Sequence, residues 1–339
     1  MRKGNEIKIK KTNKYENTSV AKERMHIENY EVTRRRFLEI SGIGAAGLLL
    51  SATGINRVFP NSDKDIRRVL VASDLHIGKI DDGQDGEIWF ARALDDLNEN
   101  VGFVDYAVVL GDIAHDAQKS ELLKYIKIKD ESDISEWFEL AGNHEFYGNR
   151  INNYRELLRS EKPYLHVDGN IVWCFLSDEL HSRPGNITEE SAGWIKEKLA
   201  EYDDKLIIMC SHQLIRGTVD ESEKPPLNFH PHERIEEILK SSKIDLWLCG
   251  HLHHGRPHSK KDVVRKGSTT YMNIASMSHA YGTGVSQSCI LEMNQGDKFI
   301  TARFRNHDKK EYDKDNEVLI PTRYPIQAAE NVNKLVPGN

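Results

Sequence analysis

Five short segments of the sequence carry side chains that bind divalent metals. They combine Asp and His at close spacing with one Asn: Asp74-Leu75-His76, Gly111-Asp112, Gly142-Asn143-His144-Glu145, His212 and Gly250-His251-Leu252-His253. Each segment follows a run of apolar or β-branched residues, where a buried strand is expected to end. Strand ends at one edge of a sheet bring ligands from distant parts of a chain together. The pattern therefore predicts a metal site, and with it an enzyme.

Taken singly, most of these segments have simpler explanations. Asp74–His76 alone could be a surface coincidence, Gly111-Asp112 a turn or a helix N-cap, and His212 a satisfied core histidine. Alternate residues of an extended strand face the same side, so Asp74–His76 and Gly250–His253 would each present two ligands in one direction. Five such strand ends in one chain leave little room for chance.

The rest of the sequence predicts alternating strands and helices, followed by strands only. Strands are expected at Arg68–Ser73, Asp105–Leu110, Glu136–Ala141, Asn170–Leu176, Lys205–Cys210, Ile244–Cys249, Thr270–Ile274, Ser288–Met293 and Lys298–Arg305. Helices are expected at Glu87–Asn100, Glu121–Ile128, Tyr154–Arg159, Glu189–Tyr202 (with Thr188 as N-cap) and Glu233–Lys240. This order indicates one α/β domain, 61–307, with two packed sheets. The polar end, 308–339, is expected to wrap its surface.

The charge is distributed unevenly along the chain. Residues 1–60 carry 12 Lys/Arg against 6 Asp/Glu, whereas the remainder carries 35 against 47. An acidic body argues against a broad nucleic-acid surface, since such surfaces gain affinity from cationic contacts to phosphates. The four cysteines, Cys174, Cys210, Cys249 and Cys289, all lie in apolar runs without a CxxC pair. They are expected to be buried free thiols.

The basic head resembles an export signal. After a polar segment, Thr33-Arg34-Arg35-Arg36-Phe37-Leu38-Glu39 is followed by the apolar run Ile40–Leu50. This resembles the twin-arginine pattern Ser/Thr-Arg-Arg-x-Phe-Leu-Lys, from which Glu39 departs. The resemblance implies transport by the twin-arginine machinery to the periplasm or extracytoplasmic face, either as a soluble protein or tethered by an uncleaved signal. The alternative is a short amphipathic helix with a chance arginine cluster.

The order DxH, GD, GNHE, H, GHxH resembles the calcineurin-like (dinuclear) metallophosphoesterase superfamily over Asp74–His253. The resemblance implies a four-layer α/β/β/α sandwich with two packed mixed β-sheets and two divalent ions, Mn²⁺, Fe²⁺ or Zn²⁺, at the strand ends. Carried over by position, Asp74, His76 and His253 would hold the first ion and Asn143, His212 and His251 the second, with Asp112 shared by both. His144 would face the substrate phosphate, and His144 and Asp112 would be the catalytic residues.

The resemblance also implies a mechanism. Two ions about 3.5–4 Å apart lower the pKa of a bridging water and support in-line attack at phosphorus, while a protonated His144 donates to the phosphoryl or leaving oxygen. Glu145 or Asp116 could orient His144. His115 stands where purple acid phosphatases carry a metal-binding Tyr, which disfavours an iron(III)-tyrosinate centre. Residues expected beside the site or at the substrate are Glu145, His115, Asp116, His254 and, from a loop after His212, Arg216.

The resemblance thus implies a phosphodiesterase or broad phosphatase acting on small phosphoesters. The competing hypothesis is a scaffold that keeps the fold, loses the chemistry and binds a protein partner. Such a scaffold is expected to lack His144 or several ligands, and here all of them are present.

Overall fold

The structure is a computed structural model that describes residues 66–178, 185–241, 243–255, 261–282, 284–328 and 335–337. The chain divides into a first unit, Met1–Ser62, and a second, Asp63–Asn339. The predicted basic head and export signal, 1–60, lie outside the described residues. Within the described ranges, no helix is both long and apolar enough to cross a bilayer.

The second unit is built on two mixed β-sheets. The first has the strand order β14-β13-β12-β1-β4-β5 with β15 paired to β13, and the second has the order β10-β11-β9-β8-β7-β6-β16. The first sheet comprises β1 (Ile66–Ala72), β4 (Tyr106–Val109), β5 (Trp137–Glu139), β12 (Gln287–Asn294), β13 (Phe299–Asn306), β14 (Glu311–Tyr312) and β15 (Val318–Pro321). The second comprises β6 (Tyr164–Asp168), β7 (Ile171–Leu176), β8 (Leu206–Ser211), β9 (Leu246–Cys249), β10 (Val263–Lys266), β11 (Thr269–Asn273) and β16 (Leu335–Pro337).

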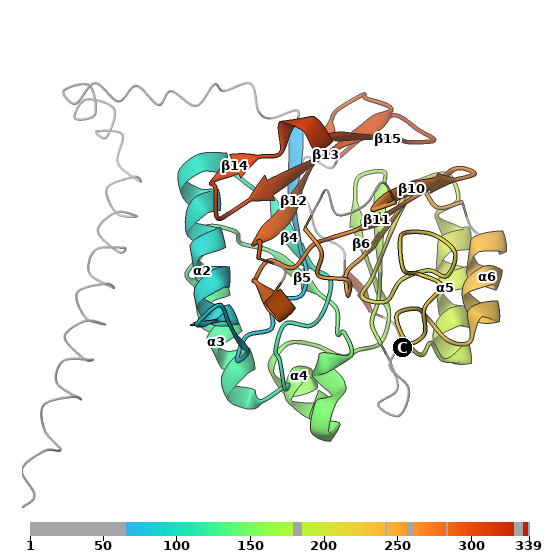
Figure 1. The fold of residues 1–339 in the computed structure, drawn as a ribbon. Helices are drawn as coiled ribbons and strands as arrows, with labels where there is room; N and C mark the ends of the chain where they lie inside the picture. Colours follow the sequence, from blue (N-terminus) through green and yellow to red (C-terminus); the bar gives the residue numbers. More distant parts are fainter. Residues whose placement is uncertain are drawn as a thin grey trace, which may run out of the picture. The chain divides into compact units, whose positions relative to one another are not determined.

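Helices cover the outer face of each sheet, which gives the four layers of the expected α/β/β/α sandwich (Figure 1). The helices are α2 (Gly86–Asp96), α3 (Lys119–Asp130) and α4 (Ile151–Leu157) on the first sheet, and α5 (Glu189–Glu201) and α6 (His232–Ser241) on the second. Three apolar clusters fill the three spaces between these layers. The predicted fold class is confirmed.

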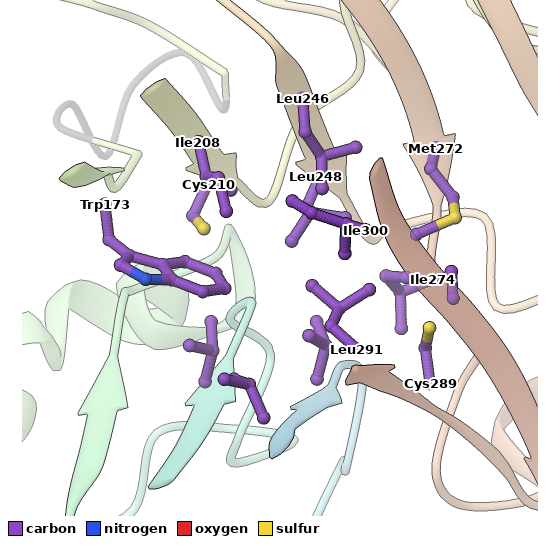
Figure 2. Close-up of a cluster of buried hydrophobic side chains, with 14 of the residues drawn as sticks. Trp173, Ile208, Cys210, Leu246, Leu248, Met272, Ile274, Cys289, Leu291 and Ile300 are labelled. Atoms are coloured by element: carbon purple, nitrogen blue, oxygen red, sulfur yellow. The ribbon is translucent and has the colours of Figure 1, made fainter. Parts of the chain in front are cut away.

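The alternation of side chains along each strand explains the layers. In β7, Trp173 and Phe175 lie between the sheets, whereas Cys174 packs toward α5 and α6. Figure 2 shows the central cluster, where Trp173 and Ile208 of one sheet face Leu291 and Ile300 of the other. Both faces of the central strands are buried, which is why they read as continuous apolar runs in the sequence. All four cysteines are buried and form no disulfide, as predicted.

Several elements differ from the prediction. The segment after 307 was expected to wrap the surface, but β14 and β15 extend the first sheet and β16 pairs with β6 of the second. Strands β6 and β10 were not predicted. A small hairpin, β2 (Ile80–Asp81) with β3 (Gln84–Asp85), was also missed, because its strands are too short to show a period. The predicted N-cap is present, since the Thr188 hydroxyl accepts from the Ser191 amide.

Candidate metal centre

The five predicted segments meet at the carboxyl ends of parallel strands. Strands β1, β4 and β5 belong to one sheet and β8 and β9 to the other, and the chain after each of them carries one segment. Backbone hydrogen bonds join these loops. The Asp74 amide donates to the Gly111 carbonyl (3.1 Å) and the Gly250 amide to the His212 carbonyl (3.1 Å). The structure therefore brings together residues that lie up to 179 positions apart, from Asp74 to His253.

The candidate ligand residues adopt an unusual backbone conformation. Five of them have positive φ: Asp74 (54°), His76 (45°), Asp112 (50°), His251 (73°) and His253 (60°). L-residues rarely adopt this region, and each such residue costs on the order of 1–3 kcal/mol. Asp74 and His76 thus reach the same volume through left-handed turns, and the expectation of an extended strand end was wrong. Strain that recurs at five converging residues is a mark of a functional site.

Two glycines allow the loops to pack this closely. A Cβ on Gly142 would lie 2.4 Å from Asp112 Oδ1, and one on Gly250 would lie 2.0 Å from Ser73 Oγ. Any larger residue at either position would displace a ligand or its neighbour.

The first group of ligand atoms comes from Asp74, His76, Asp112 and His253, all within 4.8 Å of one another. His253 Nε2 lies 3.1 Å from Asp74 Oδ1 and 3.2 Å from His76 Nε2. Asp112 Oδ2 lies 3.7 Å from His76 Nε2. Imidazole nitrogens combined with carboxylate oxygens suit zinc, iron or manganese.

The second group comes from Asp112, His212 and His251. His212 Nε2 lies 3.1 Å from Asp112 Oδ2 and 3.1 Å from His251 Nδ1. Asp112 belongs to both groups, the place that the resemblance gives it. Asn143 is nearly buried, and its Oδ1 accepts a hydrogen bond from Gln213 Nε2 (3.2 Å).

Three buried acceptors in these groups have no hydrogen-bond partner: Asp74 Oδ1, Asp112 Oδ2 and His251 Nε2. A buried polar atom without a partner costs about 1–3 kcal/mol, so a native structure rarely tolerates several together. Cations held by the two groups would satisfy these atoms. The donor set and its unsatisfied atoms therefore fit divalent metal ions.

The electrostatics of the cluster favour the same conclusion. Burial opposes charge on Asp112, yet the neighbouring His212 and His144 hold the pKa of this carboxyl well below its usual value. Burial also opposes a charged His212, but Asp112 and Asp74 raise the pKa of His212 to about 10. Burial and the charge of His212 lower the pKa of His251 to about 3. His251 thus keeps a free lone pair, and a bound cation would replace the proton of His212.

His144 is oriented by a backbone carbonyl. Its Nδ1 lies 2.5 Å from the His115 carbonyl oxygen, so Nδ1 carries the proton and Nε2 faces the site. Its backbone amide donates to Asp112 Oδ1 (2.9 Å). No described contact joins its ring to Glu145 or Asp116, the two residues proposed to orient it. The orienting partner is a main-chain group, which sequence motifs do not reveal.

Glu145 stabilises the loops instead. Its carboxylate is fully buried and accepts from the amides of Asp112 (2.9 Å), Gly142 (2.8 Å) and Ala114 (3.1 Å). Burial and the charge of Asp112 raise the pKa of Glu145 to about 8. Glu145 therefore ties the Gly111-Asp112 loop to the Gly142–Glu145 loop and fixes the position of Asp112.

The remaining predicted residues lie at different distances from the cluster. His115 is beside it, with Nδ1 3.5 Å from His76 Nδ1. Asp116 lies on the same loop, where its amide donates to Glu121. His254 follows the last ligand and is partly exposed. Arg216 pairs with Glu223 at 3.0 Å, is about half exposed, and lines a surface pocket with residues of α6. The described contacts of Arg216 thus give no support for a substrate role.

Three residues near the site were not found from the sequence. Tyr281 places its hydroxyl 3.3 Å from His144 Nε2. Gln213 Nε2 also donates to Asp178 Oδ2 (3.0 Å), and burial raises the pKa of Asp178 to about 6. Gln213 and Asp178 thereby fix the amide of Asn143. The position of Gln213 directly after a ligand was a usable signal, whereas Tyr281 and Asp178 lie outside every motif.

The chain belongs to the calcineurin-like phosphoesterase family, whose sequence model matches residues 67–255. A comparison with curated protein sequences finds no significant match.

Two solved structures show the likeness of fold. Purple acid phosphatase PPD1 from yellow lupin (Lupinus luteus) seeds aligns with a TM-score of 0.55 and 14% identity over 76% of this chain and 54% of that chain. GAP50 of Plasmodium, described as the anchor in the inner membrane complex, aligns with a TM-score of 0.55 and 15% identity over 77% of this chain and 90% of that chain. This chain therefore spans about half the length of the lupin enzyme.

Proposed function

We propose that this protein is a hydrolase of small phosphoesters, a phosphodiesterase or broad phosphatase, that works with two divalent ions, Mn²⁺, Fe²⁺ or Zn²⁺. The observation that carries the proposal is the set of buried acceptors without partners, Asp74 Oδ1, Asp112 Oδ2 and His251 Nε2, in a chain of a phosphoesterase family. Asp74, His76 and His253 would hold one ion and Asn143, His212 and His251 the other, with Asp112 shared between them.

The ions, when bound, supply positive charge that polarises the phosphoester and activates water. Two side chains of the protein would also contribute directly, Asn143 and His144. Asn143 offers a neutral amide oxygen, so it adds a ligand without cancelling positive charge. His144 has Nδ1 fixed by the His115 carbonyl, which leaves Nε2 free to donate to a phosphoryl oxygen or to the leaving oxygen when it is protonated.

The test is turnover of p-nitrophenyl phosphate and bis(p-nitrophenyl) phosphate by purified protein with and without added Mn²⁺. We expect Mn²⁺-dependent release of p-nitrophenol from at least one substrate, and preference between them separates phosphatase from phosphodiesterase. Absence of turnover on every phosphoester at full metal loading would contradict the proposal.

That negative outcome would favour the competing function, a scaffold that binds a protein partner. GAP50, which shares the fold, is described as an anchor, so the fold alone does not decide between the two. The presence here of all seven ligand residues and of His144 supports the enzyme.

We also propose that the protein is exported through the twin-arginine pathway to the periplasm or extracytoplasmic face. The support is the motif Thr33–Glu39 followed by the apolar run Ile40–Leu50. Replacing Arg34 and Arg35 by Lys should leave the protein in the cytoplasmic fraction of the producing cell. Unchanged fractionation of that variant would refute the proposal.

A further inference from the structure

Tyr281 lies over the candidate metal centre in contact with three of its histidines. Its ring stacks on the His253 ring with centroids 4.9 Å apart and an interplanar angle of 23°, and it meets the His76 ring edge-on at 5.3 Å. Its hydroxyl reaches His144 Nε2 at 3.3 Å. Tyr281 is nevertheless 51% exposed, so burial of its ring in the core does not explain its position.

The backbone of Tyr281 is strained. Its φ is 58° within the short turn η5 (Ala280–Gly282), a conformation that costs an aromatic residue free energy. Such a residue persists only where its surroundings fix it, and such sites concentrate where function requires them. Hydrogen bonds and ring contacts fix the turn that carries Tyr281.

The turn is held from several directions by charged groups. The Tyr281 amide donates to Asp81 Oδ2 in strand β2 (3.1 Å). Two residues earlier, His279 bridges Asp82 Oδ2 (2.8 Å) and Asp308 Oδ1 (3.0 Å) and stacks on Trp89 with centroids 3.8 Å apart. The small hairpin, helix α2 and the segment after β13 thus all anchor the turn that carries Tyr281.

Contacts also restrict the ring. Lys79 places its ammonium 4.1 Å from the ring centroid, and His253 stacks on the ring as well. The π surface of Tyr281 is therefore engaged by protein groups, and the hydroxyl is the group that it presents toward His144. This arrangement disfavours a stacking platform for a flat substrate and favours a hydrogen-bonding role.

We propose that Tyr281 is a substrate-contacting residue whose hydroxyl donates a hydrogen bond to the same phosphoryl oxygen that His144 contacts. This inference rests on the proposed function. Two donor atoms 3.3 Å apart can both lie within about 3 Å of one acceptor oxygen placed between them. The hydroxyl can turn about its C–O bond from His144 Nε2 toward that oxygen.

The first experiment compares Tyr281→Phe with the wild type, both loaded with Mn²⁺. Inorganic phosphate is the probe, and its binding is measured by titration calorimetry alongside kcat and KM for p-nitrophenyl phosphate. Loss of a hydrogen bond to a charged oxygen should weaken phosphate binding about tenfold or more, with kcat/KM falling to match. Metal content and the unfolding temperature should stay at wild-type values.

The matched control is Tyr202→Phe, at the end of α5 on the outer face of the other sheet, which should leave phosphate binding unchanged. Phosphate affinity within about twofold of wild type for Tyr281→Phe would overturn the inference, as would loss of metal, which would make Tyr281 a structural cover. A wild-type protein that turns over no phosphoester would instead refute the proposed function.

A double-mutant cycle tests whether the anchored turn acts through Tyr281. His279→Ala should weaken phosphate binding several-fold in the wild-type background but by less than about twofold in the Tyr281→Phe background. Equal losses in the two backgrounds would show that His279 does not work by positioning the hydroxyl. Bound Mn²⁺ and thermal unfolding, measured for each variant, show whether the protein remains folded.

Discussion

Two buried clusters of carboxylate and imidazole groups lie in the domain, and they differ in how their hydrogen bonds are satisfied. The metal-site cluster (Asp74, His76, Asp112, His212, His251 and His253) contains three buried acceptors without a partner. The Asp96 cluster (Asp96, Ser288, Arg305 and His307) is closed. Both Asp96 oxygens accept from Arg305, at 2.9 and 2.7 Å, and the ring of His307 lies between Asp96 (2.9 Å) and the Ser288 hydroxyl (2.9 Å).

This difference separates a set of metal ligands from a structural ion pair. Burial opposes charge on Asp96, but hydrogen bonds from Arg305 and His307 lower the pKa of its carboxyl. The Asp96 cluster thus neutralises its carboxylate with protein donors. The metal-site cluster instead gathers carboxylate oxygens and imidazole nitrogens, three of which lack a hydrogen-bond partner, and this is an arrangement that a cation from outside the chain would satisfy. Residue types alone, Asp with His, do not distinguish the two.

The largest effect should follow from removing the shared carboxylate. We expect Asp112→Asn to lose bound metal and to reduce phosphoester turnover at least about a thousandfold, because several kcal/mol of transition-state stabilisation are lost. Elemental analysis gives the metal content, and the rise in unfolding temperature on adding Mn²⁺ should disappear. Asp116→Asn, on the same loop, is the control. Wild-type metal content in Asp112→Asn would contradict the proposed role of Asp112 as a shared metal ligand.

The second prediction concerns His144, which we propose as a proton donor, although ring nitrogens of His76, His115 and His144 also lie within 4.8 Å of one another. His144→Ala should keep both metals and lower kcat by about 10²–10⁴-fold, the usual contribution of a positioned proton donor. The variant should keep the Mn²⁺-dependent rise in unfolding temperature that Asp112→Asn loses. If His144→Ala emptied a metal site instead, the division between ligands and catalytic residue would be incorrect.

The third prediction tests the closed cluster. Asp96→Asn leaves Arg305 and His307 buried without their counter-charge, so we expect a loss of about 3–5 kcal/mol in the free energy of unfolding. The neighbouring Asp95 is exposed on the same helix, and Asp95→Asn should change stability by less than about 0.5 kcal/mol. Urea unfolding measures both. Metal content per folded molecule should be unaffected, and a metal-dependent defect in Asp96→Asn would show that the clusters are not independent.

The sequence predicted those functional residues that come directly after a buried strand. Apolar runs located the central strands, and the polar residues after them supplied Asp74, Asp112 and His212 as candidate ligands. Parallel strands of two sheets end on one side, so the spatial grouping followed from the order of elements. It did not predict features that depend on short elements or on main-chain groups. The hairpin β2–β3 shows no period, and the carbonyl that orients His144 carries no sequence signal.

Two further features could not be predicted for physical reasons. Left-handed φ at Asp74 and His76 is forced by the loops that bond to them, so local propensity pointed to the wrong conformation. Tyr281 reaches the site through a turn fixed by Asp81, Asp82 and Asp308. Those partners are separated from it by as many as 200 positions, and only the tertiary structure joins them.

The smallest expected effect concerns a third buried site, the imidazole of His166. His166 is 1% exposed, and its Nε2 has no hydrogen-bond partner, as in the metal-site cluster. It lies among aromatic rings, however, with Phe138 at 4.2 Å and Tyr106 at 5.3 Å between centroids, and it belongs to no group of ligand atoms found among the described residues. Burial lowers the pKa of His166 to about 4.

Because the folded pKa of His166 is depressed, its contribution to stability is fully present above about pH 6.5, the value for an unfolded chain, and is lost as pH falls through about 4. The loss amounts to at most about 3 kcal/mol. His166→Phe should therefore flatten the fall in unfolding free energy between these pH values, measured by urea denaturation of metal-free protein. An unchanged slope would mean that His166 is charged in the folded protein over this pH range. The lack of a hydrogen-bond partner on a buried imidazole nitrogen would then not suffice to separate apolar burial from metal binding.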